Sequence, residues 1–176
     1  MGEQKVSSVD RKATLHRFVR ALLNDVEAME YMLEHEWFEG DITRIGAEQE
    51  MILVDRKTFK PAPIATEVME AVRDYPWIET ELARFNLEIN LDPKVFAKNS
   101  LRKMEDEILN KTRIIRDVLH PMGADLILTG ILPTIRKYDL EMHNLTPRER
   151  YQVLMDAIHK QLLGSAFELR LSGIDE

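Results

Sequence analysis

Two stretches of the chain alternate strictly between apolar and polar residues, a pattern typical of a β-strand with one buried and one solvent-facing side. In residues 43–54, Ile45, Ala47, Met51 and Leu53 share one face, whereas Glu48 and Glu50 share the other. In residues 84–91, Phe85 shares the apolar face with Leu87, and Glu88 lies between two asparagines on the polar face. Glutamate and asparagine are poor strand formers, so their recurrence at equivalent places in two strands indicates a role for that face.

The carboxylates on this face suggest a divalent metal ion. Successive side chains on one face of a strand are roughly 6.5–7 Å apart, and carboxylates at that distance repel one another unless a cation lies between them. Another interpretation stays open, because an antiparallel sheet often has one solvated face on which glutamate is ordinary. A third alternating strand is predicted at 166–172 with Glu168 and Arg170 on its polar face, and it favours the metal interpretation.

Helices are predicted by apolar residues at three- and four-residue spacing and by start signals over residues 9–36, 65–74, 100–119 and 146–163. The last of these begins at Thr146, which we expect to cap the helix because proline follows it and glutamate stands three residues later. Residues 123–133 are nearly all apolar, which predicts a central strand covered on both faces.

The alternation favours an α+β fold. The order of strands and helices would by itself suggest a parallel sheet, but strict alternation in three of the four predicted strands indicates a mainly antiparallel one. We expect helices packed on one face of the sheet and a concave, carboxylate-lined face open to a ligand on the other. The length of 176 residues fits a single domain that begins with the 9–36 helix.

Composition restricts the classes of partner. The formal net charge of −7 argues against sequence-independent binding of nucleic acid, which depends on basic clusters. Without cysteine there is no thiol nucleophile, disulfide or Cys-ligated zinc site. No apolar run approaches the length of a membrane span, and the N-terminus lacks the apolar core of a signal peptide. We therefore expect a cytoplasmic protein with neither a membrane nor a nucleic-acid partner, whose first helix packs on its own core or on a neighbouring subunit of a homo-oligomer.

Taken together, the motifs resemble those of the glutamate–cysteine ligase family 2, also called the carboxylate–amine ligases, whose fold is related to that of glutamine synthetase. The matching residues are Gly46-x-Glu48-x-Glu50 with Asp55, Glu81-Leu82 before Leu87-Glu88-Ile89, the Leu101–Leu119 helix, Gly123-Ala124 before Ile131-Leu132-Pro133, and Arg148-x-Arg150-Tyr151. The resemblance covers about residues 43–172. It implies a partial glutamine-synthetase-like catalytic domain, the N-terminal half of a larger ligase domain.

The resemblance implies an ATP-dependent ligase that acts on amino-acid substrates: ATP phosphorylates a carboxylate, and an amine then attacks the acyl phosphate. Phosphoryl transfer depends mainly on positioning and charge neutralisation, which Mg²⁺ or Mn²⁺ on oxygen ligands can supply. On this resemblance Glu48, Glu50 and Glu88 are metal ligands. Arg150 is the candidate catalytic residue, which would contact a carboxylate or phosphate with its planar guanidinium group. The further candidate cofactor-binding residues are Glu81, Tyr151, Glu168 and Arg170.

Two departures from the family pattern keep a second function open. Ile131-Leu132-Pro133 stands where the family usually has Thr-His-Pro, and Glu168-Leu169-Arg170-Leu171 stands where it usually has a histidine-containing strand. A non-catalytic ligand-sensing or partner-binding module that retains the ligase fold is therefore the alternative to an active ligase.

Overall fold

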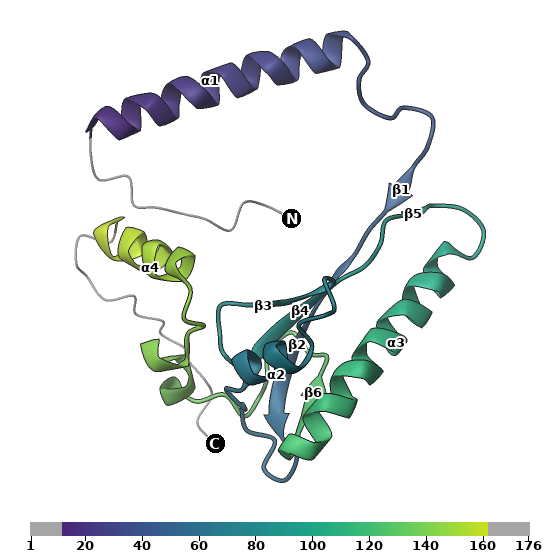
Figure 1. The fold of residues 1–176 in the computed structure, drawn as a ribbon, viewed down its shortest axis with the longest axis vertical. Helices are drawn as coiled ribbons and strands as arrows, with labels where there is room; N and C mark the ends of the chain where they lie inside the picture. Colours follow the sequence, from purple (N-terminus) through teal and green to yellow (C-terminus); the bar gives the residue numbers. More distant parts are fainter. Residues whose placement is uncertain (1–11, 162–176) are drawn as a thin grey trace, which may run out of the picture. The chain divides into compact units, whose positions relative to one another are not determined.

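The computed structural model describes residues 12–161, which form a mainly antiparallel sheet and several helices (Figure 1). The chain divides into two compact units. One unit is Phe18–Thr146, which holds every strand in the described part of the chain; the other comprises the described residues of Met1–Arg17 and Pro147–Glu176. The expected α+β class is confirmed.

The helices are α1 (Lys12–Glu34), α2 (Ala65–Ala71), α3 (Ser100–Leu119) and α4 (Glu149–Gln161), with short 3-10 helices η1 (His120–Met122), η2 (Lys137–Leu140) and η3 (Met142–Asn144). The strands are β1 (Arg44–Ile45), β2 (Glu48–Asp55), β3 (Ile78–Thr80), β4 (Asn86–Asn90), β5 (Lys94–Val95) and β6 (Ala124–Ile127). The four predicted helices are therefore present, and α3 has the predicted bounds. No helix among the described residues is long and apolar enough to cross a membrane.

The main sheet has the strand order β3-β4-β2-β6, and every neighbouring pair is antiparallel. Strands β1 and β5 form a separate two-stranded ribbon, also antiparallel. The predicted strand 43–54 is thus divided in two at Gly46 and Ala47. The break does not end the pairing, because the Leu91 amide donates to the Ala47 carbonyl oxygen at 3.0 Å.

Helices α2 and α3 pack on one face of the main sheet, as expected. Their buried side chains, which include Val68 from α2 and Ile115 and Leu119 from α3, join the odd-numbered residues of β2 and β4 in one core cluster. Met51, Leu53, Leu87 and Ile89 from these strands are fully buried. Burial of this apolar face is the main stabilising contribution to the unit.

The opposite face has an apolar end and an acidic end. At the apolar end, Ile52 and Val54 pack against Phe85 and Leu132 in a second, smaller cluster. The sequence prediction placed Phe85 on the helix-covered face with Leu87, and that prediction is wrong. The chain turns just before β4, where the Asn86 amide donates to the Ala83 carbonyl, so Phe85 stands outside the regular alternation.

One further predicted strand, 123–133, needs correction, and another, 166–172, lies outside the described residues. The strand predicted over 123–133 as a central one is β6, which is only four residues long and lies at the edge of the sheet. Residues 128–131 beyond it are exposed. An apolar run does not distinguish a central strand from an edge strand followed by a loop. The predicted strand 166–172, with Glu168 and Arg170, lies outside the described residues.

Thr146 does not begin α4 as a cap. The helix starts at Glu149, and the Thr146 hydroxyl donates instead to the Glu81 carbonyl oxygen at 2.5 Å. The Thr146 amide also donates to the carbonyl of Leu82, at 2.9 Å. These bonds hold the segment before α4 against the loop that follows β3, so tertiary pairing has replaced the local capping interaction.

Candidate functional site

Three glutamates form a row across three neighbouring strands of the sheet. Glu50 on β2 lies opposite Glu88 on β4, and Glu88 lies opposite Glu79 on β3. Directly opposed residues on antiparallel strands project from the same face with Cβ atoms about 4.5–5.5 Å apart. One step along the strands, Glu48 lies opposite Asn90. The row therefore concentrates carboxylates at the acidic end of the open face.

The pKa of the Glu88 carboxyl group is raised. Partial burial of the group is the largest cause, and the negative charges of Glu81, Glu48 and Glu50 add to it. The side chain of Asn90 acts in the opposite direction. Several carboxylates thus lie close enough to Glu88 to disfavour its ionisation. We call the surface formed by Glu48, Glu50, Glu79, Glu81 and Glu88 the carboxylate face.

The side-chain oxygen atoms on the carboxylate face suit a hard divalent cation as ligands. They are carboxylate and amide oxygens, which are the ligands that Mg²⁺ and Mn²⁺ prefer. Asn86 lies two residues before Glu88 on the same face, and its Oδ1 atom is buried without a hydrogen-bond donor in the described part of the chain. A buried acceptor without a donor is costly, and a cation or a ligand donor would satisfy it.

The glutamates of the carboxylate face are neighbours on the sheet, but their side chains do not form a compact cluster in the described structure. Within residues 12–161, no three His, Cys, Asp or Glu side chains are gathered closely enough to hold a metal ion. Among the same residues, Glu48, Glu50 and Glu88 have no ion-pair partner. Like charges that project from adjacent strands repel one another, which opposes a closer approach of these carboxylates.

A partly buried ion cluster lies beneath the end of β4, on the helix-covered side. Lys111 on α3 donates from Nζ to the Asn90 carbonyl and to Glu107 Oε1, both at 2.6 Å. Glu107 also accepts hydrogen bonds from Lys94 and from the Asp92 amide. Burial opposes the ionisation of Glu107, but these hydrogen bonds outweigh it and lower the pKa of Glu107 to about 2. The cluster fixes the strand end opposite Glu48 to α3.

Sequence reasoning found four of the five residues of the carboxylate face. Glu48, Glu50, Glu81 and Glu88 are brought together, whereas Glu79 was missed. The signal was weak because β3 is only three residues long, too short for periodicity to identify a strand. The alternation of Glu79 and Glu81 with Ile78 and Thr80 was nonetheless present in the sequence.

Two of the other predicted site residues, Arg150 and Tyr151, belong to the second compact unit, in which they contact each other. The Arg150 guanidinium donates to the Tyr151 hydroxyl at 2.6 Å and lies 4.6 Å from the centre of its ring. The Tyr151 side chain is buried. A cation–π contact of this kind orients the guanidinium plane and leaves its positive charge unchanged.

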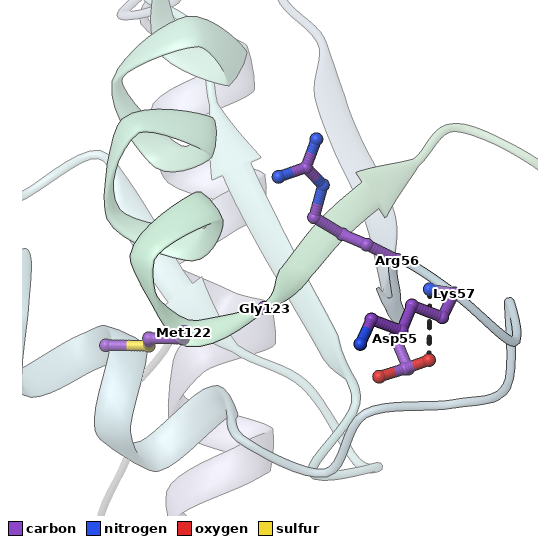
Figure 2. A pocket seen from close by; sticks show the side chains of 5 residues that line it. All are labelled: Asp55, Arg56, Lys57, Met122 and Gly123. Atoms are coloured by element: carbon purple, nitrogen blue, oxygen red, sulfur yellow. Dashed lines mark hydrogen bonds between the residues drawn. The ribbon is translucent and has the colours of Figure 1, made fainter.

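A pocket of about 490 Å³ lies at the opposite end of β2 from the glutamates. Figure 2 shows the residues that line it: Asp55, Arg56, Lys57, Met122 and Gly123. Asp55 closes the turn after β2, where Oδ1 accepts from the Lys57 amide at 3.1 Å and from the Thr58 amide at 2.8 Å. Gly123 has φ +75°, a conformation that glycine adopts readily. These contacts explain Asp55 and Gly123 as turn residues, and the pocket contains none of the predicted site residues.

Comparison with known proteins identifies the family. The sequence model of the glutamate–cysteine ligase family 2 matches residues 44–167. A protein of Leifsonia xyli subsp. xyli named "Putative glutamate--cysteine ligase 2" is 29% identical over 126 residues, which cover 69% of this chain and 32% of that relative. The chain therefore spans about a third of the length of that relative. No solved structure matches the chain. Since the family match covers well over half of the sequence, the chain belongs to the glutamate–cysteine ligase family 2.

Proposed function

We propose that the carboxylate face binds divalent cations together with ATP and serves an ATP-dependent carboxylate–amine ligase reaction of the glutamate–cysteine ligase type. The observation that carries the proposal is the row of Glu50, Glu88 and Glu79 on three adjacent strands, in which the pKa of Glu88 is raised. Family membership supports the class of reaction, and the relative from Leifsonia xyli bears the name of such a ligase.

Glu48, Glu50 and Glu88 would hold Mg²⁺ or Mn²⁺, with Glu81 beside them. A bound divalent cation neutralises phosphate charge and orients the nucleotide. In the proposed reaction the γ-phosphoryl group of ATP passes to the carboxylate of an amino acid. The amine of a second amino acid then displaces phosphate and forms the amide.

Arg150 would contact a carboxylate or phosphate oxygen, because its guanidinium group offers paired donors in a plane. Tyr151 would keep that plane in place through the contact already described. Glu168 and Arg170 remain candidate cofactor-binding residues on the strength of the family resemblance.

One observation favours the non-catalytic alternative, a ligand-sensing or partner-binding module. Leu132 stands where the family usually has a histidine, and it is 3% exposed in the apolar cluster with Ile52 and Phe85. A side chain that closes an apolar cluster supplies no ligand or proton to a neighbouring site. A module of this kind would bind cation and nucleotide without forming ADP.

The test is calorimetric titration of ATP into the 176-residue chain with Mg²⁺, with Mn²⁺ and without either, repeated on Glu50→Gln. We expect binding that requires the cation and is lost in the variant. Glu70→Gln is the matched control: Glu70 is exposed on α2, so the charge change is the same but lies away from the carboxylate face.

The outcomes separate the two candidate functions. Cation-dependent ATP binding accompanied by ADP release that depends on added amino acids supports the ligase. Binding without ADP release fits the sensing or partner-binding module and equally a ligase of which this chain spans about a third. If ATP binds equally with and without the cations, or binds Glu50→Gln as it binds the original chain, the carboxylate face is not the cation site.

A further inference from the structure

The pocket at the end of β2 has a lining with a surplus of positive charge. Arg56 and Lys57 contribute two cations, and Asp55 contributes the one carboxylate among its five lining residues. Within residues 12–161, neither cation has a carboxylate within ion-pair distance. Figure 2 shows both cationic side chains leaving the turn on the side of Gly123. The lining can therefore neutralise a bound group that carries one negative charge.

The carboxylate of Asp55 is committed to the turn that carries the two cations. Its Oδ1 atom accepts hydrogen bonds from the amides of Lys57 and Thr58, and from the Thr58 hydroxyl group at 2.8 Å. The bond from the Thr58 side chain is the largest cause of the lowered pKa of Asp55. Asp55 is thus ionised at neutral pH, and its hydrogen bonds hold the turn in shape.

The backbone around the pocket is fixed by further hydrogen bonds. The Asp55 amide donates to the Lys60 carbonyl and the Phe59 amide donates to the Asp55 carbonyl, both at 2.9 Å. The Arg56 amide donates to the Gly123 carbonyl at 3.1 Å and so joins the two walls of the pocket. All lining residues belong to the Phe18–Thr146 unit. A site built in advance in this way loses less entropy when a ligand binds.

The wall opposite the turn offers apolar contact. Met122 lines the pocket and is 45% exposed. The neighbouring Gly123 adds no side chain, and a Cβ atom placed there would meet nothing within 4 Å. The thioether of methionine makes favourable contacts with aromatic rings. The pocket therefore combines a charged side with an adaptable apolar side.

We propose that this pocket binds an organic carboxylate with an apolar body, whose carboxylate group is held by Arg56 and Lys57 and whose body contacts Met122. A guanidinium group offers paired donors that match the two oxygens of a carboxylate. The site is separate from the proposed cation site, because Asp55 and Glu48 are the two ends of β2, roughly 24 Å apart along the strand.

Benzoate serves as the probe and is titrated into the full 176-residue chain, with binding followed by the NMR signals of the backbone amides. We expect the amide signals of Arg56, Lys57 and Gly123 to shift and to saturate. Benzamide has the ring without the charge, and acetate has the charge without the ring. Each should bind at least about tenfold more weakly than benzoate.

Variants separate the charged contacts from the apolar one. Arg56→Gln and Lys57→Gln should each raise the Kd of benzoate about tenfold. Lys60→Gln is the matched control, because Lys60 is exposed on the same turn but does not line the pocket. Met122→Ser should weaken the binding of benzoate and leave that of acetate unchanged. Thermal unfolding of each variant verifies that the fold is retained.

Several results would overturn the proposal. If no amide signal around the pocket shifts in a saturable way, the pocket is not a binding site for such a ligand. If benzamide binds as well as benzoate, or if Lys60→Gln weakens binding as much as Lys57→Gln, the two cations do not recognise the carboxylate. Tighter binding of phenyl phosphate than of benzoate would assign the pocket to phosphate esters instead. The titration contains neither ATP nor a divalent cation, so its outcome is independent of the proposed ligase function.

Discussion

Glu50 on β2 lies directly opposite Glu88 on β4, so two carboxylates of the same charge occupy one cross-strand pair in the middle of an antiparallel sheet. Like charges in this position destabilise a sheet, whereas an opposite charge or an uncharged partner would stabilise it. The pair therefore lowers the stability of the sheet at neutral pH, and a bound proton or cation restores it.

Replacing Glu88 by Gln should stabilise the chain at pH 7 by roughly 0.5–1 kcal/mol, because one of the opposed charges is removed. The sign follows from the raised pKa of Glu88. A carboxyl group whose pKa is higher in the folded state than in the unfolded one favours folding when protonated, and this advantage is lost as the pH rises through the folded pKa. Thermal unfolding of both proteins at several pH values measures the difference.

The advantage of Glu88→Gln should disappear below about pH 4, the range of an unfolded glutamate, where Glu88 is protonated in both states. Glu70→Gln on α2 serves as control and should change stability little at any pH, since Glu70 is exposed. A stabilisation that persists unchanged at low pH would mean that charge repulsion is not its cause.

Replacing Glu79 by Gln should weaken the response to Mn²⁺ or Mg²⁺ in the same direction as Glu50→Gln. Glu79 completes the row on β3, directly opposite Glu88. A cation that binds only the folded state raises the melting temperature in proportion to the logarithm of its concentration above Kd. We expect that a tenfold increase in cation concentration near the Kd raises the Tm of Glu79→Gln less than it raises the Tm of Glu70→Gln. Equal responses would exclude Glu79 from the cation site.

Replacing Glu107 by Gln should destabilise the chain by about 3 kcal/mol at pH 7, because buried Lys111 then loses the anion that compensates its charge. The pKa of Glu107 is lowered to about 2. Its contribution is therefore complete above the unfolded pKa, near 4.3, and is lost as the pH falls through the folded value. Urea unfolding measures the free energy of unfolding of the original chain and of Glu107→Gln. The two values should differ strongly at pH 7 and little near pH 2.

Glu105→Gln is the control on the same helix. Glu105 is exposed and pairs with Arg102 three residues earlier, a surface ion pair of the kind that contributes about 0–1 kcal/mol. If the two variants lost equal stability, the cluster beneath β4 would contribute no more than an exposed pair.

Replacing Thr146 by Val should cost about 1 kcal/mol, because the Glu81 carbonyl loses its hydrogen bond from a buried hydroxyl group. Thr146→Ser keeps the hydroxyl and should lose clearly less. Chemical denaturation of both variants measures the difference. A similar loss in both would assign the effect to the methyl group and not to the hydrogen bond.

The part of the fold that depends on local pattern was predictable. The apolar residues of α3 recur at helical spacing, and its predicted bounds agree with those observed. Period-two alternation placed Glu48, Glu50 and Glu88 on one face of the sheet before any pairing was known. These predictions succeed because the direction of a side chain along a helix or strand follows from backbone geometry alone.

The failures share one cause, which is that the sequence window is local. Phe85 fits the alternation of β4 but lies in the turn before it, and the apolar run that contains β6 continues into an exposed loop. Glu79 was missed because three residues carry too little periodicity. In each instance the periodicity of the local sequence did not mark where the strand begins or ends.

The sequence by itself determined the α+β class, the positions of the four helices, the acidic character of one sheet face and the family, because these depend on composition, local spacing and motif. Only the tertiary structure decided that Glu50, Glu88 and Glu79 form one row, since strand order and register bring Glu88 between Glu79, nine positions before it, and Glu50, 38 positions before it. Backbone hydrogen bonds make those pairings, and they are chemically the same at every residue. Which strands become neighbours therefore depends on how their buried faces pack together.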